Sequence, residues 1–161
     1  QGGFVLDGGV HFVAATRLLL QGGKQKIKRV SAFTAQLQEH LPPIDTLNAT
    51  MQLDNGSSGT LSISFGTTDT GSEYLVACEK GSVHCARGKV TITKDGKDPE
   101  TRGFPDEGNG VNQEIKAWAK SLEQGKRNEM QSPEEALKDL EILESCLQSG
   151  EQGGKPIDVK Q

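Results

Sequence analysis

Two runs of alternating apolar and polar residues, joined by an Asn-Gly dipeptide, constrain the fold of this chain more than any other feature. In residues 46–54 and again in residues 61–65, every second position is apolar: Leu47, Ala49, Met51, Leu53, Leu61, Ile63 and Phe65. A period of two places these side chains on one face of a strand. Asn55-Gly56 between the runs favours a tight turn. The sequence therefore predicts an antiparallel hairpin with one apolar face and one face rich in Ser, Thr, Asn and Gln.

Further strands and three helices are expected around this hairpin. The alternation predicts strands at residues 30–38, 73–78, 82–86, 89–93 and 155–159. The polar residues 94–110 predict a long loop with at most a short extended piece near residues 101–104. An apolar run after Asp7 predicts a helix that ends at Gly22-Gly23, with Asp7 as its N-cap and layers of the protein on both sides. Two later helices are expected, one from Val111 to Gly125 and one from the capping box at Ser132 to a C-cap at Gly150.

This pattern predicts one α+β domain spanning residues 1–161: a mostly antiparallel, open-faced sheet with helices packed on one face, a two-layer sandwich. A length of 161 residues is enough for one hydrophobic core and gives no reason to divide the chain.

Charge and hydropathy exclude two classes of partner. The formal charge of −4 and the pI near 5.4 argue against nucleic acid. A mean hydropathy of −0.53 and the lack of an apolar run near 18 residues argue against a membrane span. The three cysteines show no metal-ligand spacing, so we expect reduced core thiols, no metal site and a cytoplasmic protein. Asp69-Thr70-Gly71-Ser72 matches the aspartic-protease tetrapeptide, but it occurs once and follows no apolar strand, which favours a turn.

The residues with the strongest chemical character are Asp7 and His11, at the start of the first helix. Their spacing of four places both on one helix face, and Ala14, Ala15 and Leu18 continue that stripe. Gly3, Gly8 and Gly9 surround the pair and indicate a close approach by backbone or by a ligand. A cap and a satisfied core histidine remain the alternative interpretation.

The stretch from Gly3 to His11 resembles the Asp-x-Gly-x-His signature that opens the second domain of the Gfo/Idh/MocA oxidoreductases. Asp7, Gly9 and His11 fall on the signature residues, and Ala14 stands where the family pattern has a second Asp. The order of helix, antiparallel strands, two late helices and a last strand also resembles that domain over almost the whole chain.

The resemblance implies a substrate-side domain of an oxidoreductase that transfers a hydride between NAD or NADP and a sugar, polyol or similar secondary alcohol. It implies catalytic roles for Asp7 and His11, with His11 exchanging the hydroxyl proton and Asp7 orienting the imidazole. The chain has no Gly-x-Gly-x-x-Gly or Glu-Lys-Pro motif. We therefore expect its cofactor to be bound by an amino-terminal Rossmann domain absent from this chain, and the chain alone to bind none and to be inactive.

The same resemblance implies a homo-oligomer, most simply a dimer, formed through the open face of the sheet. It also leaves a second function open. A non-catalytic oligomerisation or binding module of the same fold would keep Asp7 and His11 for structure alone.

Overall fold

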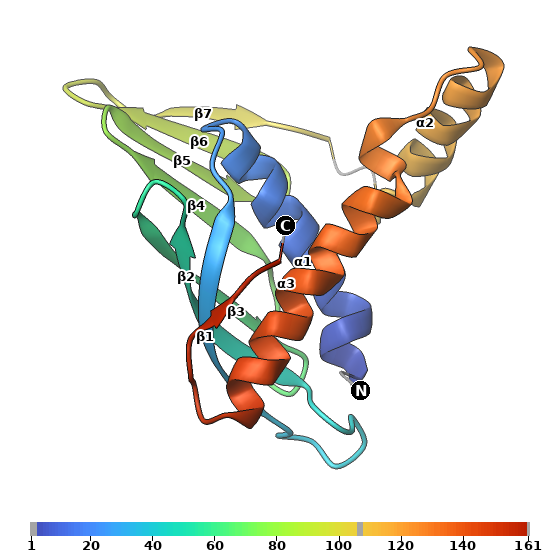
Figure 1. Cartoon of the computed structure of the whole chain (residues 1–161). Coiled ribbons are helices and arrows are strands. Elements are labelled where there is room, and N and C mark those ends of the chain that lie inside the picture. Colours follow the sequence, from blue (N-terminus) through green and yellow to red (C-terminus); the bar gives the residue numbers. More distant parts are fainter. Residues whose placement is uncertain (1–2, 106–107, 161) are drawn as a thin grey trace. The chain divides into compact units, whose positions relative to one another are not determined.

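The computed structural model of the chain describes residues 3–105 and 108–160. Within these residues the chain has an α+β architecture with antiparallel sheets and three α-helices, which confirms the predicted fold class (Figure 1). The strands in the described part of the chain form two four-stranded sheets, where the sequence had suggested one. The sheets belong to two compact units, residues 1–68 with 129–161, and residues 69–128.

The first unit contains the predicted hairpin. Its sheet has the strand order β3-β2-β1-β8, and all neighbours are antiparallel. The bounds of these strands are β1 Ile27–Ala35, β2 Thr46–Leu53, β3 Ser58–Ser64 and β8 Ile157–Asp158. Gly56 has a φ of 86°, a left-handed conformation that the turn between β2 and β3 requires and that glycine adopts without strain.

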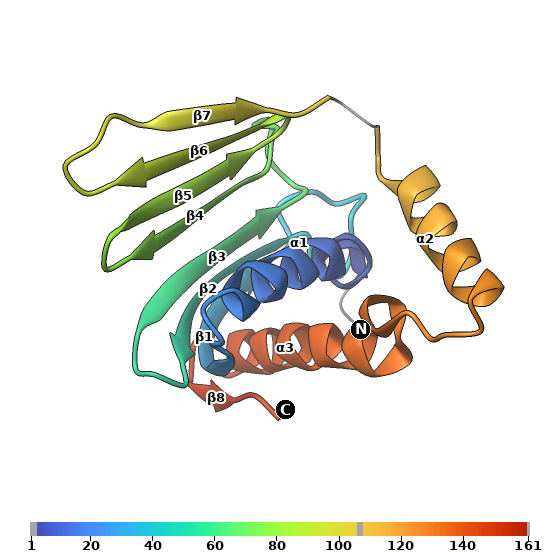
Figure 2. The same cartoon turned by 90° about the horizontal axis from the view of Figure 1, so that it is seen from above.

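Two helices, α1 Gly3–Gln21 and α3 Pro133–Glu151, cover one face of this sheet (Figure 2). The core between the layers is formed by alternate strand residues and by one stripe from each helix: Val5, Val13, Ile27, Val30, Ala32, Leu47, Ala49, Met51, Leu53, Leu61, Ile63, Ile142, Leu143 and Cys146. The opposite face is open and polar, as predicted. Phe33, 67% exposed, lies opposite Asn48 on that face.

The first helix differs from the prediction in its start and in its burial. It begins at Gly3, so Asp7 lies inside the helix and is not its N-cap. A Cβ on Gly3, at a φ of 51°, would lie 2.7 Å from the carbonyl oxygen of Pro42, so the helix starts against this distant loop. The buried residues of α1 are only Val5, Gly9 and Val13. The prediction that layers of the protein cover both sides of this helix is therefore wrong.

The apolar composition of α1 also corrects the membrane argument. An 18-residue window of this helix has a mean hydropathy of 1.3, so by length and composition alone it could cross a bilayer. Core helices of soluble proteins pass the same test. In this structure Val5 and Val13 are fully buried in the core of the first unit.

The third helix begins as predicted and ends later. Ser132 is its N-cap, and its Oγ accepts from the Glu135 N–H at 3.2 Å. Gly150 lies within the helix, so its assignment as the C-cap is wrong. A Cβ there would lie 2.4 Å from Oγ1 of Thr34, which shows that this glycine permits the close approach of α3 to β1. Ser149 also links α3 to β1, because its Oγ accepts a hydrogen bond from the Ala32 N–H at 2.8 Å.

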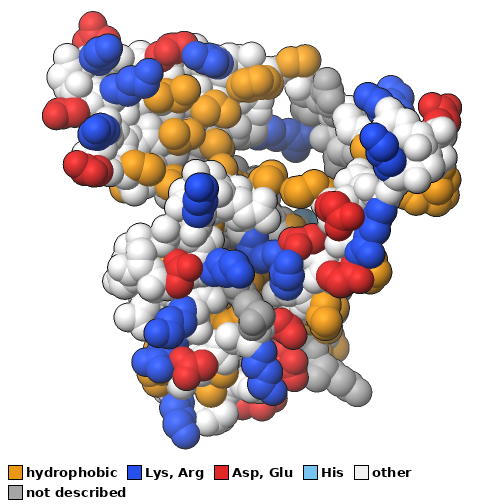
Figure 3. All heavy atoms as spheres, turned by 45° about the horizontal axis from the view of Figure 1, so that its top comes forward, with side chains coloured by type: hydrophobic (Ala, Val, Ile, Leu, Met, Phe, Trp, Pro, Cys, Tyr) orange, Lys and Arg blue, Asp and Glu red, His pale blue; other side chains and the backbone are white. Residues whose placement is uncertain are grey.

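The second unit holds the meander β4 Glu73–Cys78, β5 Gly81–Ala86, β6 Lys89–Lys94 and β7 Glu100–Gly103, followed by α2 Val111–Glu123. No described residue of these five elements is buried. Hydrophobic side chains gather over the sheet of this unit, at upper left in Figure 3, among charges of both signs. The apolar positions of α2 are 46–61% exposed: Val111, Ile115, Trp118 and Leu122.

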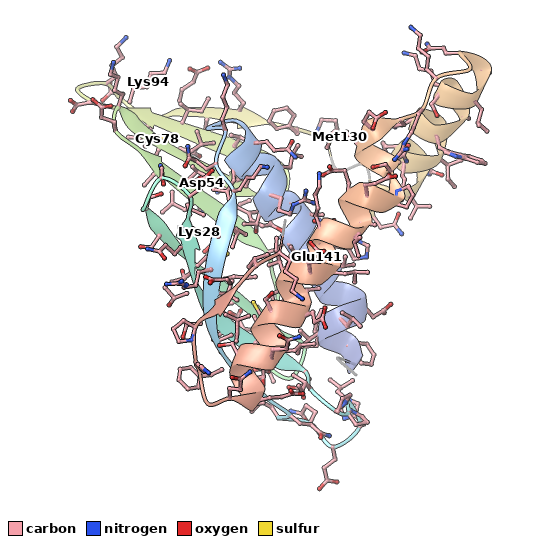
Figure 4. All side chains as sticks on the ribbon, viewed as in Figure 1. Lys28, Asp54, Cys78, Lys94, Met130 and Glu141 are labelled. Atoms are coloured by element: carbon pink, nitrogen blue, oxygen red, sulfur yellow. The ribbon has the colours of Figure 1, made fainter. Side chains whose placement is uncertain are left out.

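The cysteines do not share one environment. Cys146 is buried in the core of the first unit, and burial raises the pKa of its thiol to about 12. Cys78 is exposed, which corrects the expectation of three core thiols. Cys78 and Lys94 lie at the same end of the second sheet, where they line a shallow surface hollow (Figure 4).

Candidate active site

The candidate site is the exposed face of α1 that carries Asp7 and His11. Both side chains are exposed, and the helical spacing that places them on one face continues to Leu18, which is 53% exposed. Within the described part of the chain, no hydrogen bond joins Asp7 to His11. The structure therefore presents a carboxylate and an imidazole side by side on a helix, available to a group outside this chain.

The opposite stripe of α1 fixes the helix to the protein. This stripe consists of the buried residues Val5, Gly9 and Val13. The Cα of Gly9 faces the side chains of Ile63 and Leu143. A Cβ at Gly9 would lie 3.5 Å from each of them, at ordinary van der Waals distance. This packing turns the face that carries Asp7 and His11 outward.

The glycines around the pair have internal explanations. A Cβ at Gly8 would lie 2.5 Å from Cζ of Phe65, so this glycine receives an aromatic ring from the end of β3. The ring centroid of Phe65 lies 6.0 Å from that of Phe4 and 6.4 Å from that of Phe12. The close approach that the glycines predicted is therefore real at Gly8, and the approaching group is part of this chain.

An ion-pair cluster holds the carboxyl-terminal half of α1, and the sequence reasoning missed it. Arg17 lies 2.6 Å from carboxylate oxygens of both Glu135 and Asp139 of α3. Burial lowers the pKa of the Arg17 guanidinium, but the hydrogen bonds to Asp139 and Glu135 outweigh it, and the net pKa is raised. The signal in the sequence was a single arginine within the apolar run from Val10 to Leu20.

A second missed group is Asp45, a fully buried carboxylate before β2. It accepts hydrogen bonds from the backbone N–H groups of Leu37 and Gln38, at 3.0 and 2.8 Å, and from Oγ1 of Thr46 at 2.9 Å. Burial raises the pKa of Asp45, but these donors outweigh burial and the net pKa is lowered. Its own carbonyl oxygen accepts from the Phe65 N–H at 2.8 Å, so Asp45 fixes the end of β3 as well.

The other motifs that the sequence analysis considered carry no comparable arrangement. Residues 69–72 lie in the connection between β3 and β4, as expected for a turn rather than a protease site. His40 is exposed in the loop before Asp45, and His84 forms an exposed pair with Glu73, with Nε2 and Oε2 2.9 Å apart. Among residues 3–105 and 108–160, no group of three or more His, Cys, Asp or Glu side chains could hold a metal ion.

This chain also lacks the usual means of holding a dinucleotide. Pyrophosphate binding in Rossmann domains uses a glycine-rich turn between a strand and a helix N-terminus. No Gly-x-Gly-x-x-Gly occurs in the sequence. The residues of this chain therefore do not fit the phosphate-binding part of such a cofactor.

Comparison with known proteins gives a consistent assignment. A dehydrogenase of Fusarium mangiferae, FPY6, is 36% identical over 164 residues, which cover 99% of this chain and 47% of that protein. The crystal structure of an oxidoreductase from Thermotoga maritima superposes with a TM-score of 0.81 at 29% identity, over 98% of this chain and 44% of that one. An inositol dehydrogenase homologue of Azotobacter vinelandii, complexed with NADH and myo-inositol, shares the fold with a TM-score of 0.73 at 16% identity, over 96% of this chain and 50% of that one.

This chain thus spans about half the length of the relatives that it matches. The family model described as the C-terminal alpha/beta domain of the oxidoreductase family matches residues 1–159, almost the whole chain. The chain therefore belongs to the Gfo/Idh/MocA oxidoreductase family and corresponds to its C-terminal alpha/beta domain.

Proposed function

We propose that this chain forms the substrate side of an NAD(P)-dependent oxidoreductase that transfers a hydride between the nicotinamide and a sugar, a polyol or a similar secondary alcohol. The observation that carries the proposal is the exposed face of α1, where Asp7 and His11 lie one helical turn apart in a chain of this oxidoreductase family. Asp7 is not the helix N-cap and His11 is not a core residue, so this structure has neither of the structural roles that the sequence left open for them.

In the proposed reaction, His11 exchanges a proton with the substrate hydroxyl. An imidazole suits this task because its unperturbed pKa near 6.5 lets it accept and release a proton at neutral pH. Asp7 lies four residues before it, within reach of a hydrogen bond that would orient the ring and stabilise the imidazolium when substrate covers this face. Acid–base help of this kind contributes about 10² to 10⁴ in rate.

Hydride transfer itself requires a nicotinamide cofactor, which we assign to a Rossmann domain of the parent protein. The absence of a phosphate-binding turn in this chain supports that division of labour. The relative from A. vinelandii is complexed with NADH and myo-inositol, which motivates the substrate class proposed for this chain. Ala14 replaces the second Asp of the family pattern, so we assign no polar contact with substrate to that position.

We also propose that the parent dimerises through the open face of the first sheet. This face has the composition of a wet interface, with Asn48, Thr50, Gln52 and Ser62 around the exposed ring of Phe33. Closed two-fold pairing is the commonest way for such a face to be covered.

The proposed function is tested by assaying the parent protein with NAD⁺ and NADP⁺ against a panel of sugars and polyols. Cofactor reduction by at least one member of the panel is expected. The chain alone should show no saturable NADPH binding in calorimetry. Tight binding of NADPH by the isolated chain would contradict the assignment of the cofactor to another domain. No turnover by a folded parent across the panel would favour the non-catalytic module.

A further inference from the structure

The contact between Gly8 and Phe65 lies directly beside the candidate pair. Gly8 follows Asp7 in the chain and precedes His11 by three residues, so one turn of α1 contains all three. The absence of a side chain at Gly8 leaves a notch in the helix surface, and the ring of Phe65 occupies that notch. Any side chain at position 8 would meet the ring, because even a Cβ would lie 2.5 Å from its Cζ.

The ring is itself held from two sides. Phe4 and Phe12, one turn to either side of Gly8, have centroids 6.0 and 6.4 Å from that of Phe65, in tilted aromatic geometry. The backbone of Phe65 donates to the carbonyl oxygen of the buried Asp45 at 2.8 Å. Gly66 is also buried, and a Cβ there would lie 2.8 Å from Oδ1 of Asp45.

From this geometry we infer that Phe65, seated on Gly8, is a positioning residue for the Asp7–His11 pair, with Asp45 as its anchor. The inference rests on the proposed function of the pair. A Cβ at the motif glycine, Gly9, would fit against Ile63 at ordinary van der Waals distance, whereas a Cβ at Gly8 would collide with the ring of Phe65. Gly8 therefore determines where the turn with Asp7 and His11 lies against this ring. Of these two adjacent glycines, Gly8 is the one whose missing side chain the packing requires.

A displacement of this turn should affect the chemical step more than binding. Misplacing a catalytic group by about 1 Å can cost on the order of 10² in rate. Adding one methyl group at Gly8 forces a shift of the ring, the helix or both, because the ring cannot retreat from Phe4 and Phe12 without repacking. The effect on kcat should exceed the effect on KM, because a misplaced proton-transfer group acts on the chemical step, and cofactor affinity should change little because we assign cofactor binding to another domain.

The test uses the full-length parent with Gly8→Ala, and Gly150→Ala serves as the matched control. Both substitutions place a Cβ in a helix at less than 3.0 Å from a side chain, Phe65 in one case and Thr34 in the other. Gly150 lies in α3, far along the chain from Asp7 and His11. We expect kcat to fall on the order of 10²-fold in Gly8→Ala, with KM and cofactor Kd within about twofold, while Gly150→Ala retains parental kcat per folded molecule.

Two further measurements separate positioning from a general loss of structure. The double variant Gly8→Ala, Phe65→Leu, in which the smaller side chain makes room for the methyl group, should recover most of the lost kcat. The His11 imidazole resonance should move in Gly8→Ala and stay in place in Gly150→Ala, whether or not substrate is present. If Gly8→Ala fails to fold, Phe65→Leu alone supplies the test, because removal of the ring from the notch should also lower kcat.

Parental kcat with an unmoved His11 resonance in Gly8→Ala would overturn the inference, as would equal losses of kcat in Gly150→Ala or parental kcat in Phe65→Leu. The failure of this inference can be distinguished from failure of the proposed function. Full activity in Gly8→Ala together with loss of activity in His11→Ala removes only the positioning role. Full activity in His11→Ala removes the function on which it rests.

Discussion

Arg17 of α1 and Asp139 of α3 form a nearly buried ion pair, with Nη1 and Oδ1 2.6 Å apart and 12% and 9% of the two side chains exposed. The second guanidinium nitrogen pairs with Glu135, one helical turn earlier in α3. The pair joins the two helices through residues that are 122 positions apart in the chain. It fixes the carboxyl-terminal half of α1, while Phe65 fixes the half that carries Asp7 and His11.

Arg17→Met should lower the free energy of unfolding by about 1.5 to 3 kcal/mol, because the aliphatic part of the side chain is kept while Asp139 loses its charged partner in a nearly buried position. Urea titration of the parent and the variant measures the difference. Arg29→Met is the control, because the Arg29–Asp158 pair is 46% and 67% exposed and such pairs contribute little. Equal effects of the two substitutions would show that the Arg17 cluster has no special role.

Asp45 makes the stability of the first unit depend on pH. Its folded-state pKa is lowered, because donated hydrogen bonds outweigh desolvation, so its stabilisation is complete above the unfolded pKa near 3.9 and is lost as pH falls through the folded pKa. Asp45→Asn should destabilise the protein near pH 7, since the amide N–H₂ cannot accept from Leu37 and Gln38. The variant should lose less stability than the parent below about pH 4.

Unfolding midpoints of both proteins between neutral pH and about pH 3 measure this difference. An Asp54→Asn variant is the matched control, because Asp54 is an exposed carboxylate that accepts one backbone hydrogen bond, from Lys26. Parallel pH profiles for the parent and Asp45→Asn would contradict the role of Asp45.

The exposed ring of Phe33 should be central to the proposed dimer. Phe33→Lys places a charge in the middle of the open face and should convert a dimeric parent to a monomer in sedimentation equilibrium, with little change in melting temperature. Leu75→Lys in β4 is the control, because Leu75 is 68% exposed on the other sheet and should leave the dimer intact. A parent that stays monomeric at high concentration would remove the proposed interface.

The parts of the fold that short-range sequence patterns specify were predicted correctly. The hairpin of β2 and β3 was correctly predicted because alternation and an Asn-Gly turn specify it locally, and Ser132 was correctly identified as a cap for the same reason. The start of α1 was not predicted, because Pro42, 39 residues after Gly3, defines it. The separation of the strands into two sheets depends on pairings between distant segments, which alternation alone does not encode.

In the candidate site, too, the features that depend on local spacing were predicted and those that depend on distant contacts were not. Asp7 and His11 could be named as candidates because helical spacing predicts which residues share a face, and both are exposed on α1. The contacts that hold their helix were not predicted, because the partner of Gly8 directly follows β3 and the partners of Arg17 lie in α3. Gly8 could be interpreted only as a sign of close approach, because a glycine indicates a close contact but does not identify the contacting residue.

The central claim is that His11 exchanges the substrate proton and Asp7 supports it, and the most direct test is the turnover number of folded His11→Ala and Asp7→Asn parent protein. Both side chains are exposed, so both variants should keep the parental melting temperature. His11→Ala should lower kcat by about 10² to 10⁴ with cofactor affinity nearly unchanged. Asp7→Asn should lower kcat less, because it removes the charge but keeps a hydrogen-bonding side chain. Parental kcat in correctly folded His11→Ala protein would contradict the catalytic assignment.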